Sequence, residues 1–314
     1  NIPYADILEK FVIDLLPVPK WGKLPPGTNS ALILSHDEDY SDKKYIKMIH
    51  EEVKNNISAT YFSTSFNTMA TENIEYFTKN KIELGIHWDK FPNEIIFRKK
   101  SAQDLSRQIK LLKSKIISSR IHFLKWGNHY TNIFRHLIFN GVKIDSTYGQ
   151  NFGKGYSFST SYFFRPIDAN GSIMPILELP FEIMQNRGNA NLTYLKKLIE
   201  ENNEKYHGVL CFNFHPSEYD SSKDFRSKIT EMAQKYNILF LNLKEFLEFH
   251  NHRAESSIKA YKNYITMDAK TDLELLIPSN TTVLSLNNKR IKPNKKGSFL
   301  SIKIKKGQNV LKIK

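Results

Sequence analysis

The stretch ALILSHDED, residues 31–39, decides the fold that we expect. Its first five residues are mostly apolar and predict a buried strand, and polar residues follow directly. Side chains along a strand alternate between its two faces, so Asp37 and Asp39 point to one side wherever the extended geometry continues, and His36 and Glu38 point to the other. In parallel α/β architectures ligands bind at the carboxyl ends of the strands, so candidate functional residues are sought first at this strand end.

The chain that follows alternates short β-branched or aromatic runs with longer segments of helical period. The expected strands are 31–35, 59–63, 82–87, 120–124, 142–145, 176–179, 208–215 and 238–242. The expected helices are 42–54, 73–79, 102–117, 131–139, 192–205, 222–236 and 243–249. Repeated strand–helix–strand units imply an α/β fold with a parallel sheet, and seven or eight of them can close into a (β/α) barrel.

The segments on either side of this barrel lack its alternation of strands and helices. Residues 1–28, with prolines at positions 17, 19, 25 and 26, predict an irregular arm before a barrel over 29–250. Residues 251–264 are expected to be a linker. Four short strands separated by turn residues then predict a small antiparallel, β-sandwich-like module over 265–314. These strands are expected at 273–277, 282–286, 298–304 and 309–313.

The composition excludes several protein classes. The chain has 314 residues, of which 25% are charged and 40% hydrophobic, a globular balance that fits neither disorder nor a fibrous repeat. No apolar run approaches the roughly 18 residues that a membrane helix needs. The one cysteine, Cys211, cannot form an intrachain disulfide or a thiolate metal cage, and its apolar neighbours predict a buried side chain.

Positive charge is concentrated near the C-terminus. From Asp268 onward eleven Lys and Arg residues face three acidic ones, which is over half of the net charge of +14. This segment is suited to nucleic acid, an anionic glycan or a lipid surface, or it is a solvated surface that keeps edge strands from pairing. Nucleic acid is the least favoured partner, because the lysines lack interleaved aromatic residues or a known motif.

Further imidazoles occur at the ends of other expected strands. His87 ends the third strand, His122 shares a face with Arg120 on the fourth, and His215 ends the seventh. If these strands are neighbours, one carboxylate and two imidazoles converge into a three-ligand metal set that leaves a position for water. Each residue also has a structural interpretation: a hydrogen-bonded histidine, or an aspartate that caps the helix at 42–54.

Taken in order, these motifs resemble those of the polysaccharide deacetylases, the NodB-homology group of carbohydrate esterase family four. The resemblance spans about residues 30–250 and is to a divergent branch with an Asp-x-Asp first motif and Arg-x-His on strand four. The matching segments are 35–39, 83–87, 120–124, 144–147 and 214–216.

The resemblance implies a distorted (β/α) barrel and the metal-dependent removal of N- or O-acetyl groups from a polysaccharide or glycan precursor. It implies that Asp37 is the general base, that Asp39 and His87 bind a divalent metal, with zinc expected, and that His215 protonates the leaving group. Arg120 is expected to orient Asp37, or to form a structural salt bridge with it.

The second metal histidine that many members carry three or four residues after the first is absent here. We therefore assign its place to His122, with Asp89 as the fallback ligand. If neither binds, the protein is a pseudoenzyme that binds a glycan or an anionic polymer. The acidic residue that often follows the Leu-Pro segment is also absent, with Gln185 and Asn186 nearby, and Ser157 stands where the branch tends to carry Arg.

Aromatic residues beyond strands four and five, namely Trp126, Tyr130 and Tyr148, are predicted to stack on sugar rings, with ordinary packing as the alternative. A barrel glycosidase that pairs Asp37 with Glu178 or Glu182 is a further hypothesis. The chain starts at Asn1 in place of Met, which we interpret as processing or trimming. With the habit of the family this predicts an exported or cell-envelope protein of bacterial type.

Overall fold

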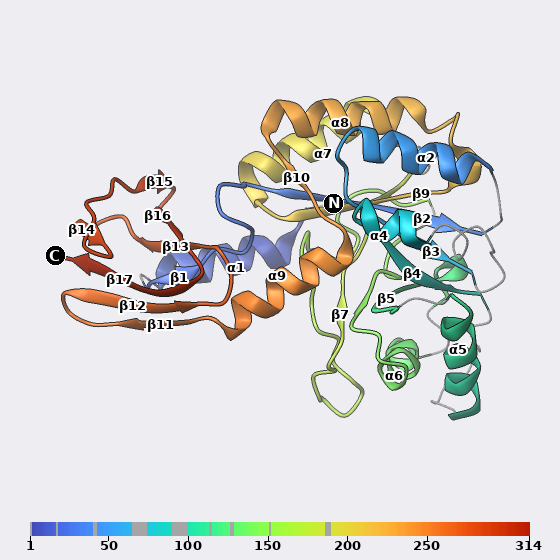
Figure 1. Cartoon of the computed structure of the whole chain (residues 1–314), viewed down its shortest axis with the longest axis horizontal. Helices are drawn as coiled ribbons and strands as arrows, with labels where there is room; N and C mark the ends of the chain where they lie inside the picture. The colour runs from blue at the N-terminus through green and yellow to red at the C-terminus, as the bar shows by residue number, and fades with distance from the viewer. Residues whose placement is uncertain are drawn as a thin grey trace. The chain divides into compact units, whose positions relative to one another are not determined.

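The computed structural model describes residues 2–16, 18–39, 43–64, 74–89, 99–112, 115–125, 129–150, 152–185 and 190–314. The chain divides into two compact units, shown in Figure 1. The barrel unit comprises residues 1–6 and 30–244, and the β unit comprises residues 7–29 and 245–314. None of the described helices is both long and apolar enough to cross a membrane.

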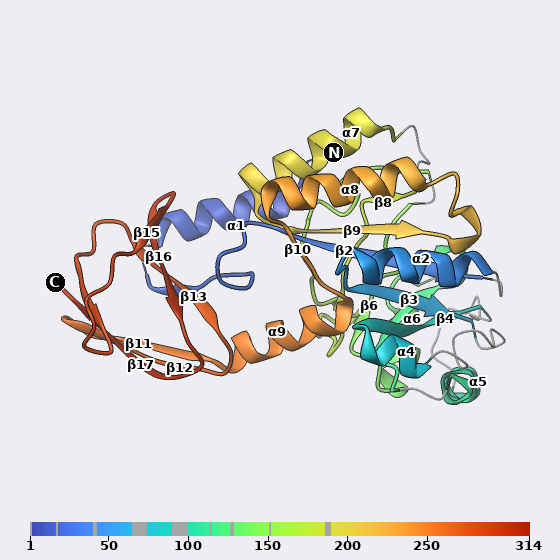
Figure 2. The same ribbon diagram turned by 45° about the horizontal axis from the view of Figure 1, so that its top comes forward.

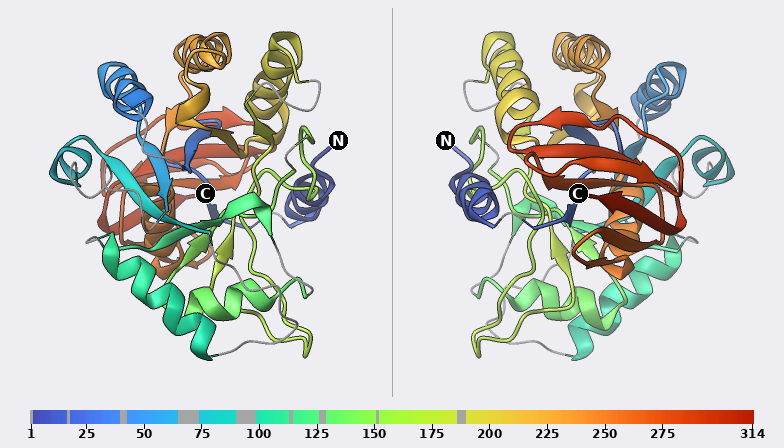
Figure 3. Two further views of the ribbon diagram at one scale, coloured as in Figure 1. Left: turned by 90° about the vertical axis from the view of Figure 1, so that its right-hand side faces the viewer. Right: turned by 90° about the vertical axis from the view of Figure 1, so that its left-hand side faces the viewer.

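The barrel unit is built on one curled parallel sheet with the strand order β7-β6-β5-β4-β3-β2-β9-β8 (Figure 3, left). The short strand β10, Leu239–Phe240, pairs in parallel with the start of β2. The other strands are β2 (Ala31–Glu38), β3 (Ala59–Ser63), β4 (Ile82–Trp88), β5 (Ser118–Ile121), β6 (Ile144–Asp145), β7 (Leu177–Glu178), β8 (Ile183–Met184) and β9 (Val209–Phe214). The predicted α/β fold with a distorted barrel is confirmed.

The two edge strands of this sheet, β7 and β8, are both contacted by the connection between β6 and β7. In that connection Phe164 forms an antiparallel bridge to Glu178 of β7, and Lys154 forms one to Ile183 of β8. Irregular chain therefore contacts the edges where a regular barrel would pair two strands, which is why the barrel is distorted.

Helices cover the outer side of the curled sheet, and Figure 2 shows α7, α8 and α2 along one side of it. They are α2 (Lys43–Lys54), α4 (Ile74–Lys79), α5 (Lys99–Leu111), α6 (Asn132–Phe139), α7 (Leu192–Glu201) and α8 (Lys223–Tyr236). All eight residues of β2 are buried, as expected for a strand covered on both faces. The carboxyl end of β2 is therefore held rigidly at the centre of the sheet.

The β unit consists of two four-stranded antiparallel sheets, with the orders β1-β13-β16-β15 and β11-β12-β17-β14. Their strands are β1 (Lys20–Trp21), β11 (Ser257–Ala260), β12 (Tyr264–Ala269), β13 (Leu273–Pro278), β14 (Val283–Leu286), β15 (Asn294–Lys296), β16 (Phe299–Ile304) and β17 (Gly307–Ile313). Inward side chains such as Ile265, Leu275 and Leu311 form its core.

Two expected segments differ from the structure. The predicted irregular arm contains helix α1 (Tyr4–Leu15) and strand β1, which pairs with Leu275 and Leu276 of β13. The predicted linker is occupied by the end of helix α9 (Leu243–Glu255) and by β11. Strands of two to four residues are too short to give a readable period, and the prolines that predicted an irregular arm lie outside α1, which contains none.

Candidate active site

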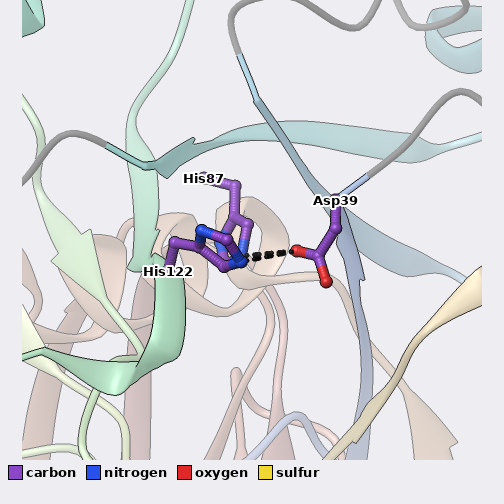
Figure 4. A group of neighbouring side chains, drawn as sticks. All are labelled: Asp39, His87 and His122. Carbon is purple, nitrogen blue, oxygen red and sulfur yellow. Dashed lines mark ion pairs between the residues drawn. The ribbon is translucent and has the colours of Figure 1, made fainter.

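Asp39, His87 and His122 converge at the carboxyl edge of the sheet (Figure 4). Asp39 Oδ1 lies 3.1 Å from His87 Nε2 and 3.4 Å from His122 Nε2. One ligand atom from each residue lies within 4.8 Å of the other two. The three residues come from chain segments that lie side by side, because β2, β3, β4 and β5 are consecutive in the sheet.

The hydrogen bonds of this group leave two acceptors facing each other. His87 Nδ1 lies 3.0 Å from the carbonyl oxygen of Arg120, and since a carbonyl only accepts, Nδ1 carries the proton. In the neutral ring Nε2 then presents its lone pair to Asp39 Oδ1, which is itself buried and without a hydrogen-bond donor among the described residues. Facing lone pairs require a shared proton or a cation, so the set of one carboxylate and two imidazoles fits a divalent metal.

His122 reaches this group from a turn and not from the expected strand. Strand β5 ends at Ile121, whose N–H donates to Thr147 Oγ1, and residues His122–Leu124 form a short 3-10 turn. Phe123 and Leu124 have φ of 57° and 52°, a left-handed conformation that is uncommon for residues other than glycine. The prediction that His122 extends strand four was therefore wrong in geometry, although the side chain arrives at the predicted place.

Asp37 lies beside the metal group and is an ionised carboxylate. It is 3% exposed, and its oxygens accept hydrogen bonds from Arg120 Nη1 at 3.0 Å and from Asn213 Nδ2 at 2.7 Å. Burial alone would raise the pKa of Asp37, but the charges of Arg120, His87 and His215 and the bond from Asn213 outweigh burial and hold that pKa well below its usual value.

Arg120 is fully buried and acts on the site only through its partners. Its Nε donates to the Ser146 carbonyl at 2.6 Å, its Nη2 to Ser146 Oγ at 2.8 Å, and its Nη1 to Ser35 Oγ and to Asp37. The guanidinium also lies over the rings of Phe62 and Phe181. The contact between Arg120 and Asp37 is a buried ion pair that also fixes one oxygen of the carboxylate, so both roles expected for Arg120 stay open.

His215, directly after β9, lies nearest to Oδ2 of Asp39, whereas His87 and His122 lie nearest to Oδ1. Its Nε2 is 3.7 Å from Asp39 Oδ2, while its Nδ1 is 3.1 Å from Nε2 of Gln185. An amide nitrogen only donates, so Nδ1 of His215 accepts and the proton of the neutral ring is on Nε2. Gln185 thus holds His215, a task for which an acidic residue near this position was expected from the resemblance. Asn186 lies outside the described residues.

The pKa values of His87 and His122 are shifted in opposite directions. Burial lowers the pKa of His87, but Asp37 and Asp39 outweigh it and raise that pKa above its ordinary value. Burial together with the nearby charge of His87 lowers the pKa of His122 despite Asp39. Of the two rings, His87 therefore binds a proton more readily than His122.

The predicted sugar-stacking aromatic residues have different positions. Tyr130 is 51% exposed and donates its hydroxyl to the carbonyl of Ile167, so one ring face stays on the surface. Tyr148 is only 6% exposed, stacks on Phe158 and donates to the carbonyl of Tyr130. The sugar-stacking role predicted for Tyr148 is therefore wrong, and the packing alternative holds. Trp126 lies outside the described residues.

One exposed aromatic residue was missed from the sequence. Phe123 is 66% exposed and stacks on the His122 ring with centroids 3.9 Å apart. The position of Phe123 depends on the left-handed turn, which no pattern in the sequence predicts. Asp89, the fallback ligand, is not part of the group of three that the described residues form.

The glycosidase hypothesis has no support in the positions of its glutamates. Glu178 and Glu182 are fully buried, and their carboxylates accept hydrogen bonds from the backbone N–H groups of Tyr148 and Cys211. Burial raises the pKa of both glutamates well above the ordinary value. They are structural groups of the core, out of reach of a polymer.

Comparison with known proteins shows the fold. No protein-family model matches the sequence, and no curated protein aligns with it significantly. A Mycobacterium smegmatis protein assigned as a polysaccharide deacetylase superposes with a TM-score of 0.52 at 14% identity, over 75% of this chain and 94% of its own. Agd3, a carbohydrate deacetylase, superposes with a TM-score of 0.50 at 8% identity, over 90% of this chain and 65% of its own. The resemblance predicted from the ordered motifs is thereby confirmed for the fold.

Proposed function

We propose that this chain is a metal-dependent hydrolase that removes N- or O-linked acetyl groups from a polysaccharide or a glycan precursor. The observation that carries the proposal is the convergence of Asp39, His87 and His122, with the ionised Asp37 beside them. The fold of the barrel unit, which polysaccharide deacetylases share, supports the choice of reaction.

Asp39, His87 and His122 would hold the ion, and the mixture of two imidazoles and one carboxylate favours zinc. A bound divalent cation supplies the Lewis acidity that polarises an acetyl carbonyl and acidifies a water molecule. Asp37 accepts the proton of the attacking water. Its low pKa makes Asp37 a weak base, so it can serve only for water that has been acidified in this way.

His215 donates the second proton of the reaction. His215 acts in its imidazolium form: the proton on Nε2, the nitrogen that faces Asp39, passes to the departing nitrogen or oxygen of the sugar, and the ring is left neutral with its proton on Nδ1. Gln185, whose amide lies against Nδ1 and whose Oε1 has no hydrogen-bond partner among the described residues, can accept from that Nδ1–H once the amide turns over. The C–N or C–O bond of the acetyl group then breaks with neutral leaving group and acetate as products. Arg120 keeps the carboxylate of Asp37 ionised and oriented throughout.

The direct test is acetate release from chitohexaose and from an O-acetylated xylo-oligosaccharide by protein purified without chelator. We expect acetate release that a chelator abolishes and added zinc restores, and we expect none from Asp39→Asn. Absence of both metal and acetate release would instead favour the catalytically inactive, glycan-binding alternative. Reducing ends released without acetate would favour a glycosidase.

A further inference from the structure

The β unit carries an exposed face that has no role in the proposed reaction. In the sheet β11-β12-β17-β14, residues directly opposite each other on neighbouring strands share a face. Tyr264 lies opposite Lys312, and Thr266 lies opposite both Val310 and Lys259. The alternate residues, Ile265, Met267 and Leu311, are buried in the core of the β unit, so the first set faces outward.

Two tyrosines at one end of this face form a flat aromatic surface. The rings of Tyr261 and Tyr264 are stacked, with centroids 4.5 Å apart and planes inclined by 19°. The hairpin between β11 and β12 holds them in place, because Tyr261 N–H donates to the carbonyl of Tyr264 at 2.8 Å. Their side chains are 47% and 42% exposed. Paired aromatic rings held by the backbone and open to solvent are typical of a recognition surface.

An open groove of about 620 Å³ lies beside Tyr264. Its lining includes the apolar residues Leu284, Val310 and Ile313 and the polar residues Lys312, Lys314 and Asn263. This volume is within the range that holds a ligand of drug size, so it is enough for a short stretch of a polymer. No carboxylate belongs to the described lining.

The charge of the β unit is unbalanced at this face. Between residues 256 and 314 there are thirteen Lys and Arg residues and three acidic ones. Each acid is already paired with a lysine, in the pairs Asp268–Lys270, Asp272–Lys305 and Glu274–Lys296. Among the described residues, Lys259 and Lys312 have no carboxylate within ion-pair distance. The face therefore combines uncompensated positive charge with aromatic and aliphatic surface.

We propose that this tyrosine–lysine face, made of Tyr261, Tyr264, Lys259, Lys312 and the adjoining groove, binds an acidic polysaccharide. The tyrosine rings stack on pyranose rings, and the lysines pair with carboxylates or phosphates carried along the polymer. The choice of a glycan rests on the function proposed for the barrel unit, since substrate polymer held by the β unit raises the local concentration of acetylated sites on the same molecule.

Nucleic acid is the competing ligand that the test must exclude. In the sequence the lysines lack interleaved aromatic residues, which disfavoured nucleic acid. In the fold, however, Tyr264 lies opposite Lys312, so an aromatic ring does lie beside a lysine. Bases also stack on aromatic rings, so a single-stranded oligonucleotide serves as the comparison probe.

The test measures binding of a hyaluronan decasaccharide, which carries a carboxylate on every second sugar, to the full chain by calorimetry at low salt. We expect Tyr264→Ala and Lys312→Glu each to weaken binding at least about tenfold, while Tyr264→Phe retains it. Lys303→Glu makes the same charge change on an exposed lysine of the other sheet and is expected to leave binding unchanged. Thermal unfolding confirms that each variant is folded.

The same experiment separates this proposal from the proposed function. Asp39→Asn is expected to lose acetate release and to bind the decasaccharide like the unmodified chain. If the unmodified chain binds but releases no acetate from any substrate, the proposed function fails and the binding face stands. Absent binding, equal binding by all variants, loss of binding in Asp39→Asn, or tighter binding of a 20-nucleotide DNA strand at the same salt would each overturn the proposal.

Discussion

Asp37 is in β2 and Asp39 directly follows that strand, yet the two carboxylates have different surroundings. Asp37 accepts hydrogen bonds from Arg120 and Asn213 and is ionised, whereas Oδ1 of Asp39 faces two imidazole nitrogens without a hydrogen-bond donor. The alternation of side chains along a strand placed them on one face, as expected. Arg120 and Asn213, the partners of Asp37, come from β5 and β9, whereas His87 and His122, the partners of Asp39, come from β4 and the turn after β5. Only the fold brings these segments together.

Replacing Asp37 by Asn should remove turnover and spare metal binding. The amide is nearly isosteric and still accepts a hydrogen bond from Arg120, but it no longer accepts a proton from water. We expect kcat for acetate release to fall by about 10²–10⁴-fold. Zinc content per chain should equal that of the unmodified protein, because Asp37 is not one of the three ligands. Unchanged kcat would exclude Asp37 as the base.

Removing the charge of Arg120 should destabilise the barrel unit strongly. Arg120→Met leaves the buried carboxylate of Asp37 with Asn213 as its one remaining donor among the described residues and removes the donors to Ser146. Breaking such a buried pair costs about 3–5 kcal/mol in the free energy of unfolding. The loss should shrink as the pH is lowered, because Asp37 without Arg120 becomes protonated more easily and an uncharged carboxyl tolerates burial.

The control for this prediction is Arg135→Met, which breaks the more exposed pair with Asp168. Because solvent screens that pair, the loss should be much smaller and nearly independent of pH between 5 and 8. Urea denaturation at several pH values measures both variants. An equal loss in the free energy of unfolding for both variants would show that the buried pair of Arg120 with Asp37 stabilises the fold no more than an exposed ion pair does.

Strand β4 is the element on which the position of His87 depends, and Gly85 explains how closely it packs. A Cβ on Gly85 would lie 2.6 Å from Cδ1 of Phe62 on β3 and 2.7 Å from Oγ of Ser118 on β5. Side chains that project from β3 and β5 therefore fill the space beside Gly85, two residues before His87, and only glycine leaves room for both.

Gly85→Ala should force these strands apart. We expect a loss of about 1–3 kcal/mol in the free energy of unfolding from overpacking. We also expect weaker zinc binding, because His87 shifts relative to Asp39. Calorimetric zinc titration of the folded variant checks the second effect. A variant with the stability and zinc affinity of the unmodified chain would show that the spacing of β3, β4 and β5 does not set the geometry of the site.

Helices and strands long enough to show a repeating pattern of apolar residues were predicted well. Elements of a few residues, or with an uncommon backbone conformation, were not. The strand 59–63 has the predicted bounds, since its β-branched and aromatic residues are all buried. The turn at His122–Leu124 was missed because Phe123 and Leu124 adopt a left-handed conformation against their own preference. Tyr148 looked available in sequence, but its burial depends on contacts with Phe158 and Tyr130 far along the chain.

Buried carboxyl groups away from the site should control how stability depends on pH. Asp145 and Glu178 face each other on neighbouring strands β6 and β7, and burial with mutual repulsion raises the pKa of Glu178 well above its ordinary value. A group whose pKa is raised by folding holds its proton more tightly in the folded state. Stability is then full below the ordinary pKa of about 4.5 and is lost as the pH rises through the raised value.

Glu178→Gln should flatten this part of the pH profile. Its amide carbonyl can still accept from the N–H of Tyr148 but does not ionise. We expect the free energy of unfolding to fall less steeply between pH 5 and 8 than in the unmodified chain, measured by urea denaturation. Glu200→Gln, at a partly exposed position on α7, should leave the slope unchanged. If the free energy of unfolding depended on pH in the same way in all three proteins, the raised pKa of Glu178 would be contradicted.

The overall architecture was accessible from the sequence because strand and helix patterns alternate and recognisable motifs end the strands. Its division into units was not, because residues 7–29 join the β unit through the two-residue strand β1, which pairs far along the chain with β13. Similarly, Gln185 was not assigned as the partner of His215, because it follows the two-residue strand β8 and takes a positive φ.

The most direct test of the whole account is a crystal structure of the chain grown with zinc, with data collected at the zinc absorption edge. We expect one anomalous peak at the sheet edge, about 2.0–2.2 Å from an oxygen of Asp39 and from Nε2 of His87 and His122. A peak that omits His122 or takes Asp89 in its place, or no peak at this edge at saturating zinc, would contradict the central claim.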